Sequence, residues 1–324
     1  TGPLGQGLAN AVGMAMAEAA NRERFGAGVC DHRVWCIAGD GCLSEGVSHE
    51  AASLAGHLRL GRLTVIYDDN HVTIDGPTEL ALTDDAIARF TAYGWHVVDA
   101  GDVGDDLDAI DAALGAAEAV DDRPSLVVLR THIGAPSPTL TDAPSAHGLA
   151  FGAAEITATK AVMGIPNEPF FVSDDVAALY RAAGARGGAA RTAWETALPA
   201  ALGERAAEWD AALSNRPLAG WTEALPTFEV GTSVATRSAL AKALTAAVPG
   251  VPGLTAGSAD LTSNTGTQLG GASPFTPDDA TGRQIHFGVR EHAMGAVMNG
   301  LALHGGVLPV GGTFLVFSDY MRPA

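Results

Sequence analysis

Positive charge is scarce in this sequence. Only 19 of its 324 residues are Lys or Arg, against 37 Asp or Glu, and the formal net charge is −18. A surface this acidic repels phosphodiester backbones and anionic lipids, so we expect neither a nucleic-acid partner nor a membrane partner. An anionic ligand would have to be held by local cations.

Cysteines and long hydrophobic runs are also few. The three cysteines, Cys30, Cys36 and Cys42, lack the spacing of a metal site or a Cys-x-x-Cys pair, which is typical of core thiols in a reducing compartment. The apolar stretch 306–317 contains Gly, Pro and Thr and is shorter than the roughly 18 residues that span a bilayer. The first residues also lack a signal-peptide pattern, so we expect a cytoplasmic protein.

Apolar runs alternate with helical patterns between residues 33 and 130. Such alternation is typical of a doubly wound α/β sheet, whose buried parallel strands read as continuous apolar runs. The expected strands are 34–37, 63–67, 95–98 and 126–129, and the expected helices between them include 47–58 and 106–120.

The pattern changes after residue 166 and then returns. Helical patterns at 174–183 and 189–213 are separated by breaks, and the Pro-containing stretch 214–231 reads as a connection between domains. The second α/β block has expected helices at 233–247 and 290–304 and expected strands at 254–257 and 284–287. We therefore expect one domain at 1–213, a linker at 214–231 and a second domain at 232–324.

The strongest chemical signal follows two neighbouring strands. Gly39-Asp40-Gly41 comes directly after the first strand, and Asp68-Asp69-Asn70 directly after the second. The carboxyl ends of parallel strands share one rim, so Asp40, Asn70 and a backbone carbonyl near Val72 form an oxygen set suited to Mg²⁺ or Ca²⁺. A Gly-Asp-Gly tripeptide alone is more often a tight turn. The helix and strand between the two motifs favour the metal site.

The run 39–51 that contains this motif resembles the transketolase family of thiamine-diphosphate enzymes. Five further stretches match that family in order: 1–7, 67–70, 257–261, 288–292 and 312–317. The resemblance covers essentially the whole chain, yet the chain covers only about half of such an enzyme. It implies two doubly wound parallel-sheet domains, one for the diphosphate and one for the pyrimidine of the cofactor, both truncated by the ends of this chain.

The resemblance also implies cofactor contacts. Asp40, Asn70 and the Val72 carbonyl would hold Mg²⁺ or Ca²⁺, and Gly41 would bring its N–H close to the diphosphate. The other expected cofactor contacts are Gly2, Pro3, Leu4, His147, Asp260, Leu261, Phe314, Phe317 and Tyr320. The turn 2–4 could instead be an ordinary helix start, and Asp260 could simply cap a loop. The three aromatic residues could instead form a stripe in the core.

Glu291 resembles the glutamate that activates the cofactor. In the family this residue shares a proton with N1′ of the aminopyrimidine, and the exocyclic nitrogen then removes the C2 proton of the thiazolium. A plainer alternative is an acid stabilised by the dipole at a helix start, worth roughly 0.3 to 1 kcal/mol. The other motifs favour the catalytic role.

Sugar-phosphate contacts are implied for Arg237, Ser263 and His147, with His147 also counted as catalytic. Arg suits bidentate phosphate binding. The stretch 260–264, Asp-Leu-Thr-Ser-Asn, is one residue shorter than the usual family pattern, which leaves the alignment of Ser263 open.

The implied activity is transfer of a two-carbon ketol unit from a ketose phosphate to an aldose phosphate, as in the pentose phosphate pathway. The family works as a homodimer with active sites shared between subunits. Two alternatives remain: an enzyme similar to dihydroxyacetone synthase, and one part of a split transketolase that is inactive alone.

Overall fold

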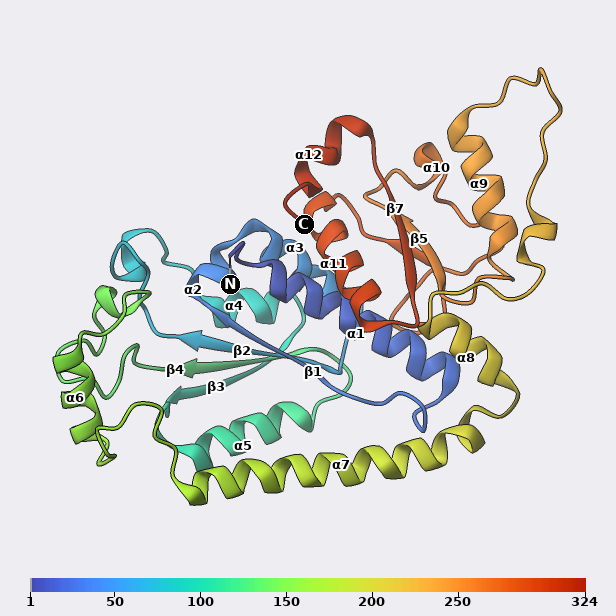
Figure 1. Cartoon of the computed structure of the whole chain (residues 1–324). Helices are drawn as coiled ribbons and strands as arrows, with labels where there is room; N and C mark the ends of the chain where they lie inside the picture. Colours follow the sequence, from blue (N-terminus) through green and yellow to red (C-terminus); the bar gives the residue numbers. More distant parts are fainter. Residues whose placement is uncertain (1) are drawn as a thin grey trace.

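The computed structural model describes residues 2–324 and arranges them as two α/β units (Figure 1). Thr1, the first residue of the matching stretch 1–7, lies outside the described residues. The strands are β1 (Val34–Gly39), β2 (Leu63–Asp69), β3 (His96–Asp102), β4 (Ser125–Arg130), β5 (Leu254–Ser258), β6 (Gln284–His286) and β7 (Leu308–Gly312). The helices are α1 (Gln6–Phe25), α2 (Asp40–Ser44), α3 (Gly46–His57), α4 (Ala86–Ala92), α5 (Leu107–Glu118), α6 (Ala153–Val162), α7 (Asp174–Leu202), α8 (Ala206–Leu213), α9 (Thr236–Ala247), α10 (Thr262–Thr265), α11 (Glu291–His304) and α12 (Ser318–Met321).

The first unit is built on a parallel sheet of strand order β1-β2-β4-β3. Helices lie on both faces, with α1 to α4 on one side and α5 and α7 on the other (Figure 1). On the α5 face, Ala113 and Ala117 pack with Val127 of β4. The predicted doubly wound sheet is confirmed, and each expected strand overlaps one of β1 to β4.

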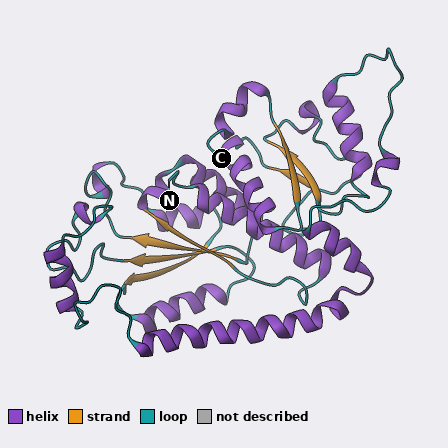
Figure 2. Ribbon diagram, viewed as in Figure 1, coloured by secondary structure: helices purple, strands orange, loops and turns teal. Residues whose placement is uncertain are grey.

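The second unit is a smaller parallel sheet of order β6-β5-β7, seen as the separate group of strands in Figure 2. The expected strands at 254–257 and 284–287 overlap β5 and β6. Strand β7 lies inside the apolar stretch 306–317, for which no strand was expected. In the part of the chain that the structure describes, no helix is long and apolar enough to cross a membrane.

Helix α7 corrects the expected pair of helices at 174–183 and 189–213. It is continuous from Asp174 to Leu202 and passes through Gly184, Gly187 and Gly188. Each glycine lowers helix stability by roughly 1 kcal/mol relative to Ala, and the good helix formers of the surrounding Ala-rich sequence offset this cost. The break comes instead at Gly203, whose φ of 53° favours glycine.

The two units meet along α1 and α11, which pack closely. A Cβ on Gly13 would lie 2.0 Å from the Val297 carbonyl oxygen, and one on Gly300 would lie 2.0 Å from the Asn10 carbonyl oxygen. No side chain fits at these two positions. The glycines therefore allow the helix backbones to approach, and they join the units through one continuous core.

Candidate active site

Asp40 begins α2 directly after the last residue of β1, and its side chain is buried at 4% exposure. The Tyr67 hydroxyl donates a hydrogen bond of 2.5 Å to Asp40 Oδ1. Among the described residues, Oδ2 has no hydrogen-bond partner. Burial raises the pKa of this carboxyl, an effect that the Tyr67 hydrogen bond opposes. A buried carboxylate oxygen without a partner fits a bound cation, which would compensate its charge.

The cavity beside Asp40 is strongly acidic. It has a volume of about 410 Å³. Arg89 forms an ion pair of 2.8 Å with Asp84, which lines the cavity, so the positive charge of Arg89 is already paired. A diphosphate would be repelled from this wall unless a divalent cation came between them. The acids and the histidine that line the cavity are Asp40, Asp69, His71, Glu79, Asp84 and Asp85.

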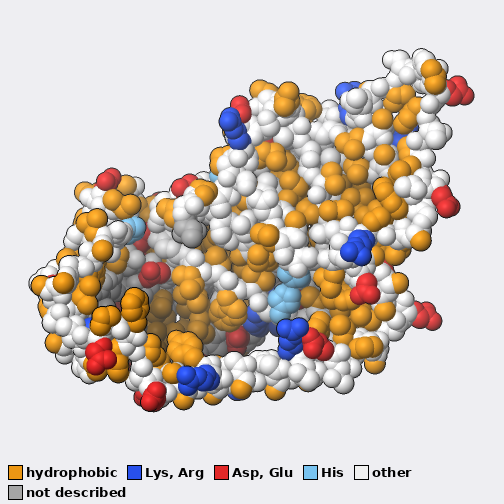
Figure 3. Space-filling view, viewed as in Figure 1, with side chains coloured by type: hydrophobic (Ala, Val, Ile, Leu, Met, Phe, Trp, Pro, Cys, Tyr) orange, Lys and Arg blue, Asp and Glu red, His pale blue; other side chains and the backbone are white. Residues whose placement is uncertain are grey.

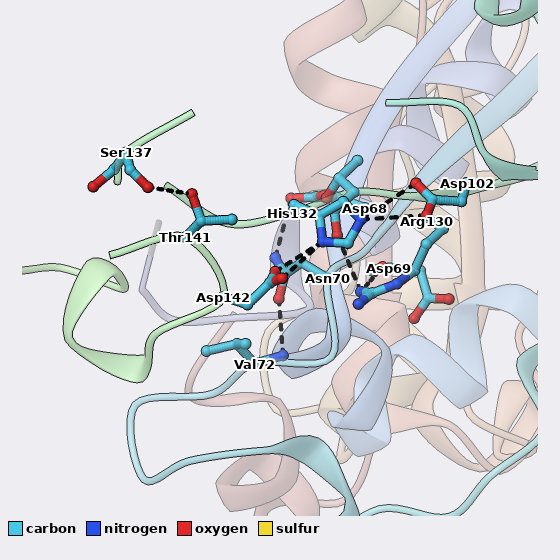
Figure 4. Close-up of polar contacts among 11 residues, drawn as sticks. Asp68, Asp69, Asn70, Val72, Asp102, Arg130, His132, Ser137, Thr141 and Asp142 are labelled. Atoms are coloured by element: carbon cyan, nitrogen blue, oxygen red, sulfur yellow. Dashed lines mark hydrogen bonds and ion pairs between the residues drawn. The ribbon is translucent and has the colours of Figure 1, made fainter. Parts of the chain in front are cut away.

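Asn70 and Val72 lie on the same rim as Asp40, because Gly39 of β1 pairs with Asp68 of β2. Asn70 Oδ1 accepts a 3.0 Å hydrogen bond from the Val72 N–H, as Figure 4 shows. An amide oxygen has two lone pairs, so this bond leaves one for a metal. Neither residue lines the acidic cavity itself.

His132 ties the end of β3 to the loop after β4, and Arg130 ties the end of β4 to the end of β2 (Figure 4). The imidazole lies 2.8 Å from Asp142 and 3.3 Å from Asp102. The hydrogen bond to Asp142 raises the pKa of His132 most, and the hydrogen bond to Asp102 raises it further. Arg130 donates to the Asp69 carbonyl oxygen at 2.9 Å, which fixes the backbone just before Asn70.

Leu4 lies against the Gly-Asp-Gly motif. A Cβ on Gly41 would lie 2.9 Å from Leu4 Cδ1, so a larger residue at position 41 would push Leu4 away. Gly2 and Pro3 are exposed and joined by a cis peptide bond. The structure therefore brings the turn 2–4 together with the motif at the start of α2.

A second group of predicted residues lies at the carboxyl end of β5. Asp260 and Ser263 line one cavity there, and Asp260 has a φ of 61°. The Leu261 N–H donates to Ser258 Oγ at 3.0 Å, which holds the loop to the strand. Arg237, in the first turn of α9, is adjacent, since a Cβ on Gly266 would lie 2.2 Å from its carbonyl oxygen.

Glu291 is the first residue of α11, but another acid caps this helix. Glu50 of α3 accepts a 2.9 Å hydrogen bond from the Ala293 N–H. The Gln6 amide lies 2.6 Å from His292 Nε2 and adds a second contact between the units. The side chain of Glu291 is therefore not needed as the cap.

Phe314, Phe317 and Tyr320 form a row of aromatic rings rather than part of a core. The ring centroids of Phe314 and Phe317 are 5.9 Å apart and stacked, and those of Phe317 and Tyr320 are 6.2 Å apart and nearly perpendicular. Phe314 is 41% exposed and Tyr320 is 64% exposed. These rings leave apolar faces open for a flat partner.

The two groups of residues do not share a cavity in one chain. The cavity beside Asp40 is lined by the first unit, and the cavity beside Asp260 by the second. His147 is exposed after a short 3₁₀ turn, Pro144–Ala146.

Tyr67 and Glu50 are site residues that sequence reasoning missed. A buried tyrosine hydroxyl needs a partner, so the position of Tyr67 at the end of a buried strand was the available signal. No signal in the sequence pointed to Glu50, because its partner Ala293 lies 243 positions later in the chain.

Two family models match the chain. Residues 1–219 match "Transketolase, thiamine diphosphate binding domain", and residues 232–324 match "Transketolase, pyrimidine binding domain". Together they confirm the predicted cofactor, thiamine diphosphate.

The chain is also similar in sequence and in structure to known transketolases. The transketolase of Halalkalibacterium halodurans is 46% identical over 100% of this chain and 49% of its own length, and transketolase 2 of Xanthobacter flavus is 48% identical over 100% and 48%. The structure of transketolase from Leishmania mexicana has a TM-score of 0.95 at 40% identity, over 99% of this chain and 49% of that chain. A Pichia stipitis transketolase mutant in complex with xylulose 5-phosphate has the same TM-score and identity, over 99% and 50%.

The chain thus spans about half the length of the curated relatives it matches. The match nevertheless extends over both α/β units. The chain belongs to the transketolase family.

Proposed function

We propose that the protein containing this chain is a transketolase, which transfers a two-carbon ketol unit from a ketose phosphate to an aldose phosphate. The observation that carries the proposal is the buried, unpartnered Oδ2 of Asp40 on an acidic rim, next to the Gly41 backbone. The relatives, which are themselves transketolases, support the same activity.

Asp40, Asn70 and the Val72 carbonyl would hold Mg²⁺ or Ca²⁺, which are bound by oxygen ligands. The hydroxyl of Tyr67 orients the Asp40 carboxylate by fixing Oδ1 and leaving Oδ2 for the metal. The N–H of Gly41 lies at the start of α2, where a backbone without a side chain admits a phosphate oxygen. Gly2, Pro3 and Leu4 would contact the cofactor from the turn beside Gly41.

Thiamine diphosphate, when bound, supplies the carbon nucleophile that attacks a ketose. Glu291 would hold and return the proton at N1′ of its pyrimidine, while Phe314, Phe317 and Tyr320 stack on that ring. Asp260 and Leu261 would contact the cofactor from the loop that Ser258 fixes.

Arg237 and Ser263 would bind the phosphate of the sugar, and His147 would contact substrate and cofactor oxygens. The structure of a Pichia stipitis transketolase with sedoheptulose 7-phosphate supports a sugar phosphate as substrate. A guanidinium in the first turn of α9 suits that anion in a chain with few cations.

We propose that the active site is shared between two subunits. Asp40 and Glu291 of one chain would then serve different sites, which agrees with the separate cavities beside Asp40 and Asp260. We also propose the domain boundaries 1–213, 214–231 and 232–324. The start of the pyrimidine-binding family model at 232 supports the last of them, whereas the first model extends to 219. A cytoplasmic location stays a prediction from the sequence.

A transfer assay tests the proposal. The purified protein is given thiamine diphosphate, Mg²⁺, xylulose 5-phosphate and an aldose phosphate, and the products are identified by mass. A ketose phosphate two carbons longer than the acceptor is expected. No transfer by a folded, cofactor-loaded protein would contradict the proposed activity. In a parallel reaction with formaldehyde in place of the aldose phosphate, preferential transfer to formaldehyde, which yields dihydroxyacetone, would favour the alternative enzyme.

A further inference from the structure

Three side chains of the metal-binding type meet at the junction of the two α/β units. Cys30 and His32 lie between α1 and β1, and His304 is the last residue of α11. One ligand atom from each of the three lies within 4.8 Å of the others. Histidine side chains gather at this junction on the face shown in Figure 3.

The separation of each neighbouring pair of atoms is close to that between two zinc ligands, with a different nitrogen of His32 facing each partner. His32 Nε2 and His304 Nε2 are 3.0 Å apart, and Cys30 Sγ is 3.7 Å from His32 Nδ1. With Zn–N bonds of about 2.0–2.1 Å and Zn–S bonds of about 2.3 Å, tetrahedral ligand atoms lie about 3.3–3.6 Å apart. His32 turns Nδ1 toward Cys30 and Nε2 toward His304, and its ring is stacked on that of His304 with centroids 4.9 Å apart. Metal binding therefore requires the His32 side chain to turn until one of its nitrogens faces both partners.

The surrounding residues already orient His304. Its Nδ1 lies 2.9 Å from the Gly305 carbonyl oxygen, so the N–H at Nδ1 donates there and Nε2 keeps its lone pair. The buried Asn21 donates to the same carbonyl at 3.1 Å and fixes it. A backbone carbonyl on the second ring nitrogen is the usual outer partner of a metal-bound histidine.

We propose that Cys30, His32 and His304 bind one Zn²⁺ and thereby join the two α/β units. A thiolate and two neutral imidazoles are ligands that Zn²⁺ prefers, and water would complete the tetrahedron on the exposed side of His32. The Cys30 thiol proton passes to solvent when the metal binds, and no electron is transferred. The competing arrangement is a metal-free chain of hydrogen bonds from Cys30 through His32 to His304.

This site is remote from Asp40. Strand β1 has six residues between the two, each rising about 3.3 Å, so Cys30 and Asp40 lie near opposite ends of a span of roughly 20 Å. The zinc therefore has a structural role in holding α11 to the start of β1. It does not depend on the proposed transfer activity.

Cobalt and zinc binding test the proposal. The purified protein is stripped with a chelator, saturated with Mg²⁺ to occupy oxygen sites, and titrated with Co²⁺ and then Zn²⁺. We expect one Co²⁺ per chain with a thiolate-to-cobalt absorption band, displaced by one equivalent of Zn²⁺. Zn²⁺ should also raise the melting temperature.

Single substitutions identify the ligands. Cys30→Ala should abolish the thiolate band, and His32→Ala or His304→Ala should weaken Zn²⁺ binding by more than the roughly 10- to 100-fold cost of losing an outer partner. Cys36→Ala and His57→Ala, which change the same residue types elsewhere, should leave binding unchanged. The proposal is overturned if the parent shows no thiolate band, or if that band survives Cys30→Ala.

Discussion

Replacing Asp40 by Asn is the sharpest perturbation of the proposed metal site. The change preserves shape and lets the side-chain oxygen still accept from Tyr67, but it puts an uncharged amide where the unpartnered Oδ2 now lies. A charged contact of this kind is worth about 1.5–3 kcal/mol, so the affinity for metal and cofactor should fall about 10- to 150-fold.

The size of the effect on stability follows from linkage. At a ligand concentration 100 times its Kd, binding stabilises the folded state by about 2.7 kcal/mol. A 100-fold weaker affinity leaves about 0.4 kcal/mol at the same concentration. Thermal or urea unfolding with and without Mg²⁺ plus thiamine diphosphate measures both values.

Asp84→Asn is the matched control. Asp84 lines the same cavity and the substitution removes the same charge, yet its carboxylate is half exposed and pairs with Arg89. An exposed pair is worth about 0–1 kcal/mol, so this variant should keep the ligand-dependent stabilisation. Equal losses in the two variants, or full stabilisation of Asp40→Asn, would refute the assignment of Asp40 to the metal.

Four further outcomes are expected. Tyr67→Phe should lower the free energy of urea unfolding by about 1–3 kcal/mol, because it removes the hydrogen bond to the buried Asp40 carboxylate; a loss below 0.5 kcal/mol would contradict that role. Burial raises the pKa of Asp40 above 3.8, so its contribution to the stability of the metal-free protein is present at low pH and is lost as pH rises through the raised pKa. Mg²⁺ needs the carboxylate, so calorimetry should show its affinity falling as pH drops toward that pKa, and pH-independent binding would argue against Asp40 as a ligand. Arg237→Ala should raise KM for phosphorylated sugars by the equivalent of about 1.5–3 kcal/mol, and equal losses with unphosphorylated donors would exclude a phosphate contact.

Features encoded locally were predictable from the sequence. The strands of the first sheet are continuous apolar runs, and Gly39-Asp40-Gly41 directly follows one of them, so the shared rim follows from parallel-strand geometry. The helix at Glu291 was likewise expected from its apolar periodicity.

Features that depend on distant partners were not predictable. Glu50 and Gln6 contact α11 only because α1, α3 and α11 pack together, and that packing depends on Gly13 and Gly300. The continuity of α7 through three glycines was also not predicted. Glycine has a low helix propensity, so closely spaced glycines indicate a helix end even where the flanking residues keep the chain helical.

Proton exchange at C2 of the bound cofactor measures directly the activation step that we propose for Glu291. Glu291→Gln keeps the shape of the side chain and removes its carboxylate. In the cofactor-loaded protein, exchange with deuterated solvent should slow by at least roughly 10², the contribution of a lost acid-base partner. Asp108→Asn, which removes an exposed acid from the first turn of α5, should exchange at the parent rate. Exchange at the parent rate in a folded, cofactor-loaded Glu291→Gln protein would show that Glu291 does not activate the cofactor.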